Sequence, residues 1–252
     1  MIQKYLSEFI KDILIKKGFY KKSKFDKSFI HGALIMSLSK KNEGDLLKII
    51  QVGANDGITG DYLHDFLKIF GDQISILFVE PQLNLKDKLL ANTKNICKKT
   101  SYAFVAVTKN CNQLLRLYLP IKGNLSHHSG LASFDKNQIL KRFRIFTKIK
   151  DPKLNEDYIA LEVPQKNLLE LANEWDSNFK DNKISDVLII DAEGYDDEVI
   201  YSLNDVNKLP DLISFEWKNL SKQKYTKLEK YLSLAGFKVI KFSKADSVAI
   251  RI

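Results

Sequence analysis

Short apolar runs alternate with amphipathic segments along most of the sequence beyond residue 45. The apolar runs have the length of buried strands, and the segments between them place apolar residues at helical spacing. This alternation predicts an α/β fold, in which a mostly parallel sheet is covered by helices on both faces. The expected strands are 46–52, 74–80, 102–108, 113–120, 186–191, 211–217, 237–243 and 247–252, and the expected helices are 58–71, 83–93, 167–175, 195–203 and 221–235.

The last two expected strands are joined by only three residues, 244–246. A crossover between parallel strands takes about a dozen residues or more, whereas a tight hairpin joins antiparallel strands. We therefore expect the sheet to end in an antiparallel pair.

Two helical patterns, 2–18 and 27–39, precede the alternating region. They predict an N-terminal helical cap over residues 1–45, followed by one main domain over 46–252. Within the main domain, residues 120–164 interrupt the alternation for longer than a simple connector in a compact domain does. This segment is predicted to be a lid-like insertion over the substrate.

Composition limits the class of protein. The chain has 252 residues, of which 44% are hydrophobic, and two cysteines, Cys97 and Cys111, too few for a disulfide framework or a Cys-rich zinc site. Such sparing use of cysteine suits a reducing compartment. No apolar run approaches the roughly 18 residues of a membrane span, and charge is scattered through the N-terminal segment. These observations predict a soluble, cytoplasmic protein.

The net charge of +9 is concentrated in two stretches. Residues 1–45 hold ten Lys against five acids, and residues 136–153 hold five Lys and two Arg against one acid. A Lys-rich solvated surface is the simplest interpretation. The alternative is a surface that attracts anionic partners, such as nucleic acid, phosphorylated sugars or lipid headgroups. Only four of the basic residues are Arg, however, and Arg binds phosphate with a more suitable geometry than Lys does. The helix expected in the second stretch places Ile139, Phe143 and Phe146 on one face, which favours packing over weak contact with a membrane surface.

A glycine-rich loop follows the first expected strand. Gly53 and Gly57 permit positive φ, and Asn55 is among the few other residues that tolerate it. Glu80 ends the second strand, 27 residues after Gly53, where an acid can accept from both hydroxyls of a ribose. Taken alone, the loop can be a plain turn and Glu80 a helix cap before Pro81. Together they predict a cofactor that contains adenosine.

The loop differs from two common nucleotide motifs. Asn55 occupies the position at which a dinucleotide loop has its second glycine, where the pyrophosphate approaches the backbone most closely. The lysine of a phosphate-binding P-loop is also missing. S-adenosylmethionine, which has a ribose and an amino-acid tail but no phosphate, is the remaining common cofactor.

The string D-x-E-G-Y-D follows a buried strand at 191–196. With the glycine loop and Glu80, this string makes the sequence resemble a class I S-adenosylmethionine-dependent methyltransferase of the FkbM family, over roughly residues 46–245. The string is the most specific part of the resemblance. The resemblance implies a three-layer Rossmann-like fold with a seven-stranded, mostly parallel sheet whose last strand is antiparallel. It also implies methyl transfer, usually to a hydroxyl of a sugar, a glycan or a related small molecule. The matching segments are IIQVGANDG (49–57), FVEP (78–81), FVAVT (104–108), SGLASF (129–134), LIIDAEGYDDEVI (188–200) and LISFEW (212–217).

The resemblance assigns roles to residues of the expected cofactor site. Glu80 is expected to hold the ribose, Ala106 to lie near the adenine and Asp191 near the methyl group. Gln51 stands where many class I enzymes have an acid, and its carbonyl can still accept from the amino group of the cofactor. The residues expected around the methionine part are Gly53, Ala54, Asn55 and Gly57.

Three carboxylates are expected at neighbouring strand ends, from Asp191, Glu193 and Glu216. They are candidates either for Mg²⁺ ligands, which are hard oxygens, or for one base whose pKa is raised by mutual repulsion. His128, in the polar loop 126–130, is a candidate base or an orienting group for the acceptor, since imidazole titrates near neutrality. An exposed loop histidine without a catalytic role is the alternative.

Two rival functions remain. The basic charge prompts a nucleic-acid methyltransferase, but enzymes that methylate amino groups commonly have Asn/Asp-Pro-Pro-aromatic after the fourth strand, where this chain has Asp191-Ala192-Glu193-Gly194. A non-catalytic cofactor-binding module is the other, because a fold does not dictate a function. The leading hypothesis is methyl transfer to a small-molecule or glycan acceptor, with nucleic acid disfavoured as a partner.

Overall fold

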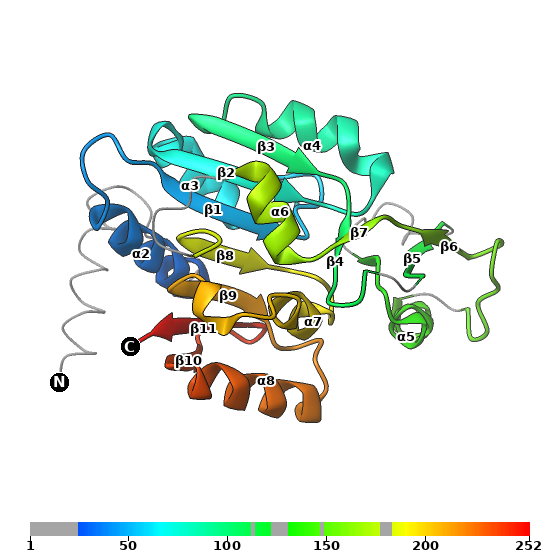
Figure 1. Ribbon diagram of the computed structural model, residues 1–252. Helices are drawn as coiled ribbons and strands as arrows, with labels where there is room; N and C mark the ends of the chain where they lie inside the picture. The colour runs from blue at the N-terminus through cyan, green and yellow to red at the C-terminus, as the bar shows by residue number, and fades with distance from the viewer. Residues whose placement is uncertain (1–24, 112–113, 122–130, 147–148, 177–182) are drawn as a thin grey trace.

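The computed structural model describes residues 25–111, 114–121, 131–146, 149–176 and 183–252. A seven-stranded sheet forms the middle layer, in the order β10-β11-β9-β8-β1-β2-β3 (Figure 1). Its strands are β1 (Leu47–Val52), β2 (Ile74–Val79), β3 (Lys99–Ala103), β8 (Val187–Ile190), β9 (Leu212–Glu216), β10 (Phe237–Lys241) and β11 (Asp246–Arg251).

Only β11 runs against its neighbours in this sheet, since it pairs antiparallel with both β9 and β10 while the remaining pairs are parallel. The predicted Rossmann-like sheet with an antiparallel last strand is confirmed. The order of the strands reverses between β1 and β8, and ligands of such sheets bind outside the carboxyl ends at this point.

Helices cover both faces of the sheet (Figure 1). Successive strand residues point to opposite faces, so Ile49 packs with α2, α3 and α4 whereas Ile50 packs with α6, α7 and α8. Burial on both faces explains why the strands are nearly continuous apolar runs. The covering helices are α2 (Phe25–Ser39), α3 (Leu63–Phe70), α4 (Lys86–Thr93), α6 (Leu168–Trp175), α7 (Asp196–Tyr201) and α8 (Lys222–Leu234), with short 3₁₀ turns at η1 (Gly71–Gln73), η2 (Leu83–Leu85) and η5 (Val206–Lys208).

The N-terminal segment contributes α2 to one of these layers. Ile30 and Leu34 on this helix are fully buried against the sheet. Residues 1–24 of the predicted cap lie outside the described residues. Within the part of the chain that the structure describes, no helix has both the length and the apolarity that crossing a bilayer requires.

The third strand was placed wrongly by the sequence prediction. It covers Lys99–Ala103, not 102–108, because the chain leaves the sheet after Ala103. The backbone N–H of Ala106 donates to the carbonyl of Pro164, 2.8 Å away, so that β4 (Ala106–Val107) pairs with β7 (Gln165–Lys166) instead. Val105, Ala106 and Val107 are buried in this second arrangement, which is why their apolar character mimics a central strand.

The insertion lies beyond the carboxyl ends of the parallel strands (Figure 1). Its β5 (Arg116–Pro120) and β6 (Tyr158–Glu162) form a separate antiparallel pair, so the expected strand at 113–120 belongs to the insertion and not to the central sheet. The insertion's helix is α5 (Lys136–Phe146), and its Ile139 and Phe143 are buried. These two side chains confirm a packing face on this helix, and the side chain of Phe146 lies outside the described residues.

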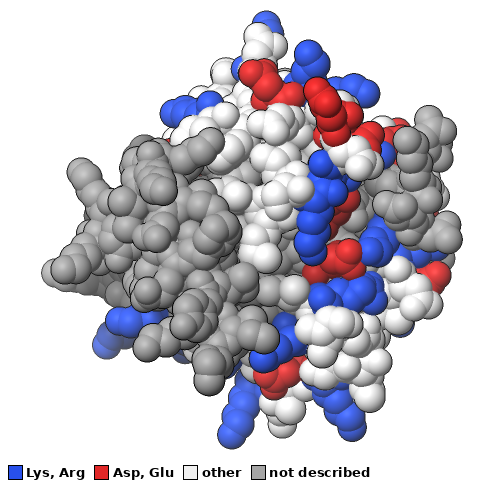
Figure 2. Space-filling model, turned by 90° about the vertical axis from the view of Figure 1, so that its left-hand side faces the viewer, with Lys and Arg blue, Asp and Glu red and all other residues white. Residues whose placement is uncertain are grey.

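Basic and acidic side chains alternate on the face shown in Figure 2. Several pair across the starts of the strands: Lys41 lies 2.9 Å from Asp186, while Lys183 and Arg251 lie 2.6 and 3.0 Å from Asp211. Such exposed pairs contribute little stability. They leave no continuous basic patch among the described residues of this face.

Candidate active site

A cavity lies outside the carboxyl ends of β1, β2 and β8, where the reversal of strand order predicts a ligand. Its walls come from the ends of these strands, the loop after β1, β4, and residues 132–134 of the insertion. The predicted site residues that line it are Gln51, Gly53, Ala54, Asn55, Glu80, Ala106, Asp191 and Glu193.

Backbone conformation and close packing require glycine at two positions of the loop. Gly53 has φ +81°, and a Cβ at this position would come within 1.9 Å of the carbonyl oxygen of Asp191. The ends of β1 and β8 therefore touch at Gly53. Gly57 has φ +78° and packs against Thr93 of α4, and it does not line the cavity. The packing of the loop against α4 thus requires glycine at position 57, and its place beside the methionine part of the cofactor stays a prediction.

The side chain of Glu80 is buried and is fixed by the loop. The backbone N–H of Asn55 donates to one carboxylate oxygen at 2.8 Å, and the N–H of Gln82 donates to the other at 3.0 Å. Burial raises the pKa of Glu80 above its ordinary value, and these hydrogen bonds oppose that shift. A carboxylate has about four lone-pair sites, so it keeps the capacity to accept from a hydroxyl in the cavity.

Gln51, the last residue but one of β1, is 5% exposed and presents an unpaired acceptor. Its Nε2 donates to Oδ2 of Asp61 at 3.2 Å, but its buried Oε1 has no hydrogen-bond partner. Leaving a buried carbonyl unpaired costs about 1–3 kcal/mol. The residue lines the cavity while Oε1 itself is closed off, so a bound donor reaches this atom only when the side chain shifts.

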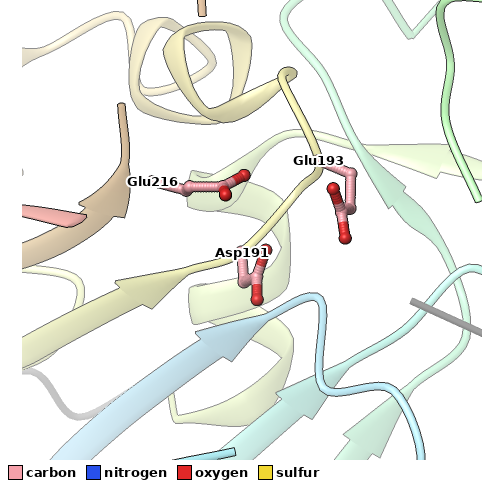
Figure 3. Close-up of side chains that lie close together, drawn as sticks. All are labelled: Asp191, Glu193 and Glu216. Atoms are coloured by element: carbon pink, nitrogen blue, oxygen red, sulfur yellow. The ribbon is translucent and has the colours of Figure 1, made fainter. Parts of the chain in front are cut away.

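The three predicted carboxylates do come together (Figure 3). Asp191 follows β8, Glu193 lies in the turn that leads into α7, and Glu216 ends β9. One oxygen from each lies within 4.8 Å of the others. Glu193 has φ +51° and Gly194 has φ +93°, so the turn holds two consecutive left-handed residues. For Glu this conformation is uncommon, and such backbone strain concentrates at functional sites.

Asn219 and Arg142 bind two of the three carboxylates. The Nδ2 of Asn219 donates to Oε2 of Glu193 at 2.8 Å and to Oε2 of Glu216 at 2.6 Å. The Nη2 of Arg142 donates to the same Oε2 of Glu193. Two donors therefore fix Glu193, and one of them also fixes Glu216.

Asp191 differs from its neighbours. Among the described residues no hydrogen-bond donor contacts its carboxylate, which is exposed to the cavity. Protein surrounds the carboxylate on its remaining sides, so partial removal from water raises the pKa of Asp191 well above its ordinary value, and repulsion by Glu193 and Glu216 raises it further. For Glu216, burial and the charge of Glu193 raise the pKa to about 7. Asp191 is thus a carboxylate with an elevated proton affinity and free lone pairs.

Sequence reasoning missed the two donors. Arg142 was grouped with the basic stretch 136–153, and the available signal was the rarity of Arg in a Lys-rich chain. Asn219 follows Glu216 by three residues, close to a strand end, which was its only signal. His128 lies outside the described residues, and its role stays a prediction.

The geometry agrees with a family comparison. The sequence profile of the FkbM methyltransferase domain matches residues 51–239. The chain belongs to this methyltransferase family. The match runs from the end of β1 into β10 and includes the loop after β1 and all three carboxylates, and membership makes the chain an S-adenosylmethionine-dependent methyltransferase.

Solved structures similar to this FkbM methyltransferase are distant. An O-methyltransferase from Bacillus cereus in complex with SAH has 10% identity and a TM-score of 0.45, over 98% of this chain and 91% of that chain. Precorrin-6y C5,15-methyltransferase from Geobacter metallireducens has 11% identity and a TM-score of 0.41, over 92% and 93%. A fibrillarin pre-rRNA processing protein from Methanococcus jannaschii has 14% identity and a TM-score of 0.41, and the match spans 66% of its length. No curated protein matches the sequence.

Proposed function

We propose that this FkbM methyltransferase transfers a methyl group to a hydroxyl oxygen of a sugar, glycan or related small molecule, with Asp191 as the general base. The observation that carries the proposal is the state of Asp191: an elevated pKa and, among the residues that the structure describes, no hydrogen-bond donor, at a cavity that also presents Gln51 and Glu80. A base with a pKa nearer neutrality takes up a proton more effectively than an ordinary carboxylate.

The residues of the cavity suit S-adenosylmethionine. The unpaired Oε1 of Gln51 is an acceptor for the α-amino group, and Glu80 is an acceptor for ribose hydroxyls. Ala106 is a small buried residue that leaves room for the adenine. The loop residues Ala54 and Asn55 line the cavity between these positions, where the methionine part belongs.

When bound, the cofactor supplies a methyl group on a positively charged sulfur, so that attack by the acceptor oxygen forms the C–O bond while the electron pair of the C–S bond returns to sulfur. Asp191 takes the hydroxyl proton as the oxygen attacks. Holding the hydroxyl against this carboxylate also aligns the oxygen for transfer, and such alignment is a large part of catalysis.

A second cavity adjoins the first and shares Asp191 and Glu193 with it. Its walls are the loop after β1, residues 82–85 with Lys88, and β5 and β6 of the insertion. We assign the acceptor to this cavity, since Asp191 lines both cavities and a hydroxyl in the second one can reach its carboxylate. The insertion then acts as the predicted lid-like element.

The carboxylate cluster does not fit a resident Mg²⁺. Two donors, one of them the Arg142 guanidinium, already contact Oε2 of Glu193. A divalent cation at this place meets the charge of Arg142 at close range. We therefore propose that the three carboxylates serve proton transfer, and that EDTA leaves the activity unchanged. Loss of activity with EDTA, restored by Mg²⁺, would overturn this part of the proposal.

The rival functions have less support. The net charge of +9 is weak support for a nucleic-acid acceptor, because a basic surface is unspecific. A non-catalytic module would not require the free carboxylate of Asp191. Transfer of label to an oligonucleotide, or tight cofactor binding without turnover on any acceptor, would favour these alternatives.

The test is a transfer assay with methyl-labelled S-adenosylmethionine and a panel of methyl glycosides and simple alcohols. We expect turnover by the wild type and a loss of about 10²–10⁴-fold in Asp191→Asn, the range for a general base. Cofactor binding, measured by calorimetry, should persist in this variant. Asp87→Asn, at an exposed position of α4, is the matched control. Full activity of Asp191→Asn would refute the role of Asp191.

A further inference from the structure

Arg142 connects the insertion to residues 191–195, the turn between β8 and α7, although the two are far apart in sequence. We call this turn the catalytic turn. We infer that Arg142 is a positioning residue for methyl transfer. Its guanidinium holds Glu193 and the backbone of residues 131–132 together, so that this part of the insertion and the catalytic turn keep one fixed arrangement. This inference rests on the proposed function of the same site.

The contacts of Arg142 go to two different segments. Its Nη2 donates to Glu193, and the side chains of the pair are 11% and 25% exposed. Its Nη1 donates to the carbonyl of Leu131 at 2.7 Å and lies 3.5 Å from that of Ala132. The guanidinium therefore bridges the carboxylate and the backbone through separate nitrogen atoms.

The segment held by Arg142 separates the two cavities. Leu131 lines the acceptor cavity, whereas residues 132–134 line the cofactor cavity. Arg142 itself lines neither cavity. Its influence on transfer must then pass through Glu193 and residues 131–134, which is why we class it as a positioning residue.

Additional contacts join the same two parts of the molecule. The hydroxyl of Ser133 donates to the carbonyl of Glu193 at 3.4 Å, and the Phe134 and Tyr195 ring centroids lie 5.0 Å apart. Gln138, one turn before Arg142 on α5, donates to the carbonyl of Asn219 at 3.2 Å. Residues four apart on a helix share a face, so α5 presents both polar side chains to the catalytic turn.

The geometry requires arginine and not only a positive charge. A guanidinium presents several N–H groups in a rigid fork, whereas lysine offers a single ammonium on a flexible stem. A lysine at position 142 keeps the charge beside Glu193 but cannot hold the backbone of Leu131 with a second nitrogen. Arg142→Lys therefore separates the positioning role from simple charge compensation.

The experiment compares the wild type with Arg142→Lys and Arg142→Gln. Arg144→Gln is the matched control, because Arg144 lies on the same helix at an exposed position and its one hydrogen bond within the described residues goes to the carbonyl of Lys150. Turnover is measured with saturating S-adenosylmethionine and the methyl glycoside panel, and active sites are counted by S-adenosylhomocysteine binding. We expect kcat to fall about tenfold in the Lys variant and about 100-fold in the Gln variant, since small misplacements of reacting groups cost this much.

A second readout separates this inference from the proposed function. Hydrogen exchange of peptides covering 131–134 and 191–195 should accelerate in both Arg142 variants and stay unchanged in Arg144→Gln. If the wild type methylates no acceptor, the proposed function fails. The exchange result still decides whether Arg142 holds residues 131–134 against residues 191–195. The inference is overturned if exchange is unchanged, or if Arg142→Lys keeps wild-type kcat. A fall in folded fraction alone, with normal kcat per active site, would assign Arg142 to stability instead.

Discussion

The unpaired Oε1 of Gln51 leads to a prediction that separates cofactor binding from stability. Replacement by Met keeps an unbranched side chain of similar size and removes the buried acceptor. The gain is about 1–3 kcal/mol for the acceptor that is no longer stranded, and it is offset by about 1.5–3 kcal/mol for the lost hydrogen bond to the carboxylate of Asp61. The stability of the unliganded variant should therefore stay within about 1 kcal/mol of the wild type, which corresponds to a change in Tm of no more than roughly 2–4 °C for a chain of this length.

The same change should weaken cofactor binding. A hydrogen bond to a charged group contributes about 1.5–3 kcal/mol, so losing the bond to the ammonium of the cofactor lowers affinity by about 10- to 100-fold. Calorimetry with S-adenosylmethionine gives the affinity, and urea unfolding of the unliganded protein gives the stability.

Thr100→Val is the matched control for Gln51→Met. The hydroxyl of Thr100 on β3 is also buried without a partner, and this residue lines neither cavity. Its replacement should raise stability and leave cofactor affinity unchanged. Wild-type affinity in Gln51→Met would refute the contact with the cofactor. A marked fall in stability would show that Oε1 has a partner in the unliganded protein.

Three more substitutions test the site. Gly53→Ala should cost about 2–4 kcal/mol in urea unfolding, because positive φ and the approach of a Cβ to the carbonyl of Asp191 both oppose it; a neutral effect would contradict the contact between strand ends. Glu80→Gln should lower S-adenosylmethionine affinity about tenfold or more, and wild-type affinity should decline on acidification at a pH above the ordinary 4.5 of glutamate, a decline that calorimetry should not find in the variant. Glu216→Gln should stabilise the protein by about 1–2 kcal/mol above pH 7. The folded pKa of about 7 lies above the ordinary 4.5, so the wild-type protein loses stability as the pH rises from about 4.5 to about 7, and the advantage of the variant should vanish near pH 4.5. Equal unfolding curves at high pH would exclude this.

The strands of the sheet centre could be predicted because they obey one rule. Residues 49–52 and 187–190 are buried on both faces, so their continuous apolar runs mark them without ambiguity. The third strand could not be placed in the same way, because Val105 and Val107 are buried in a different pairing, and hydrophobicity reports burial but not the partner. The short link at 244–246 correctly predicted the antiparallel pair.

The site was predicted where its residues follow strand ends, and missed where they come from elsewhere. Asp191 and Glu216 meet because adjacent parallel strands end at one edge. A loop glycine marks an unusual φ without saying whether a ligand or a helix is close, and at Gly57 the structure shows α4 close by. The contact of Arg142 with Glu193 joins positions 51 residues apart through tertiary packing, and no local pattern encodes it.

The junction between β1 and β8 has a consequence for how this enzyme can diversify. The backbone of Gly53 lies against the carbonyl of Asp191, and the N–H of Asp191 donates to the carbonyl of Val52 at 2.9 Å. Main-chain contacts therefore fix the spacing between the glycine loop and Asp191. Under the proposed function, exchanges of residues on β5 and β6 would change which acceptor fits while that spacing stays constant.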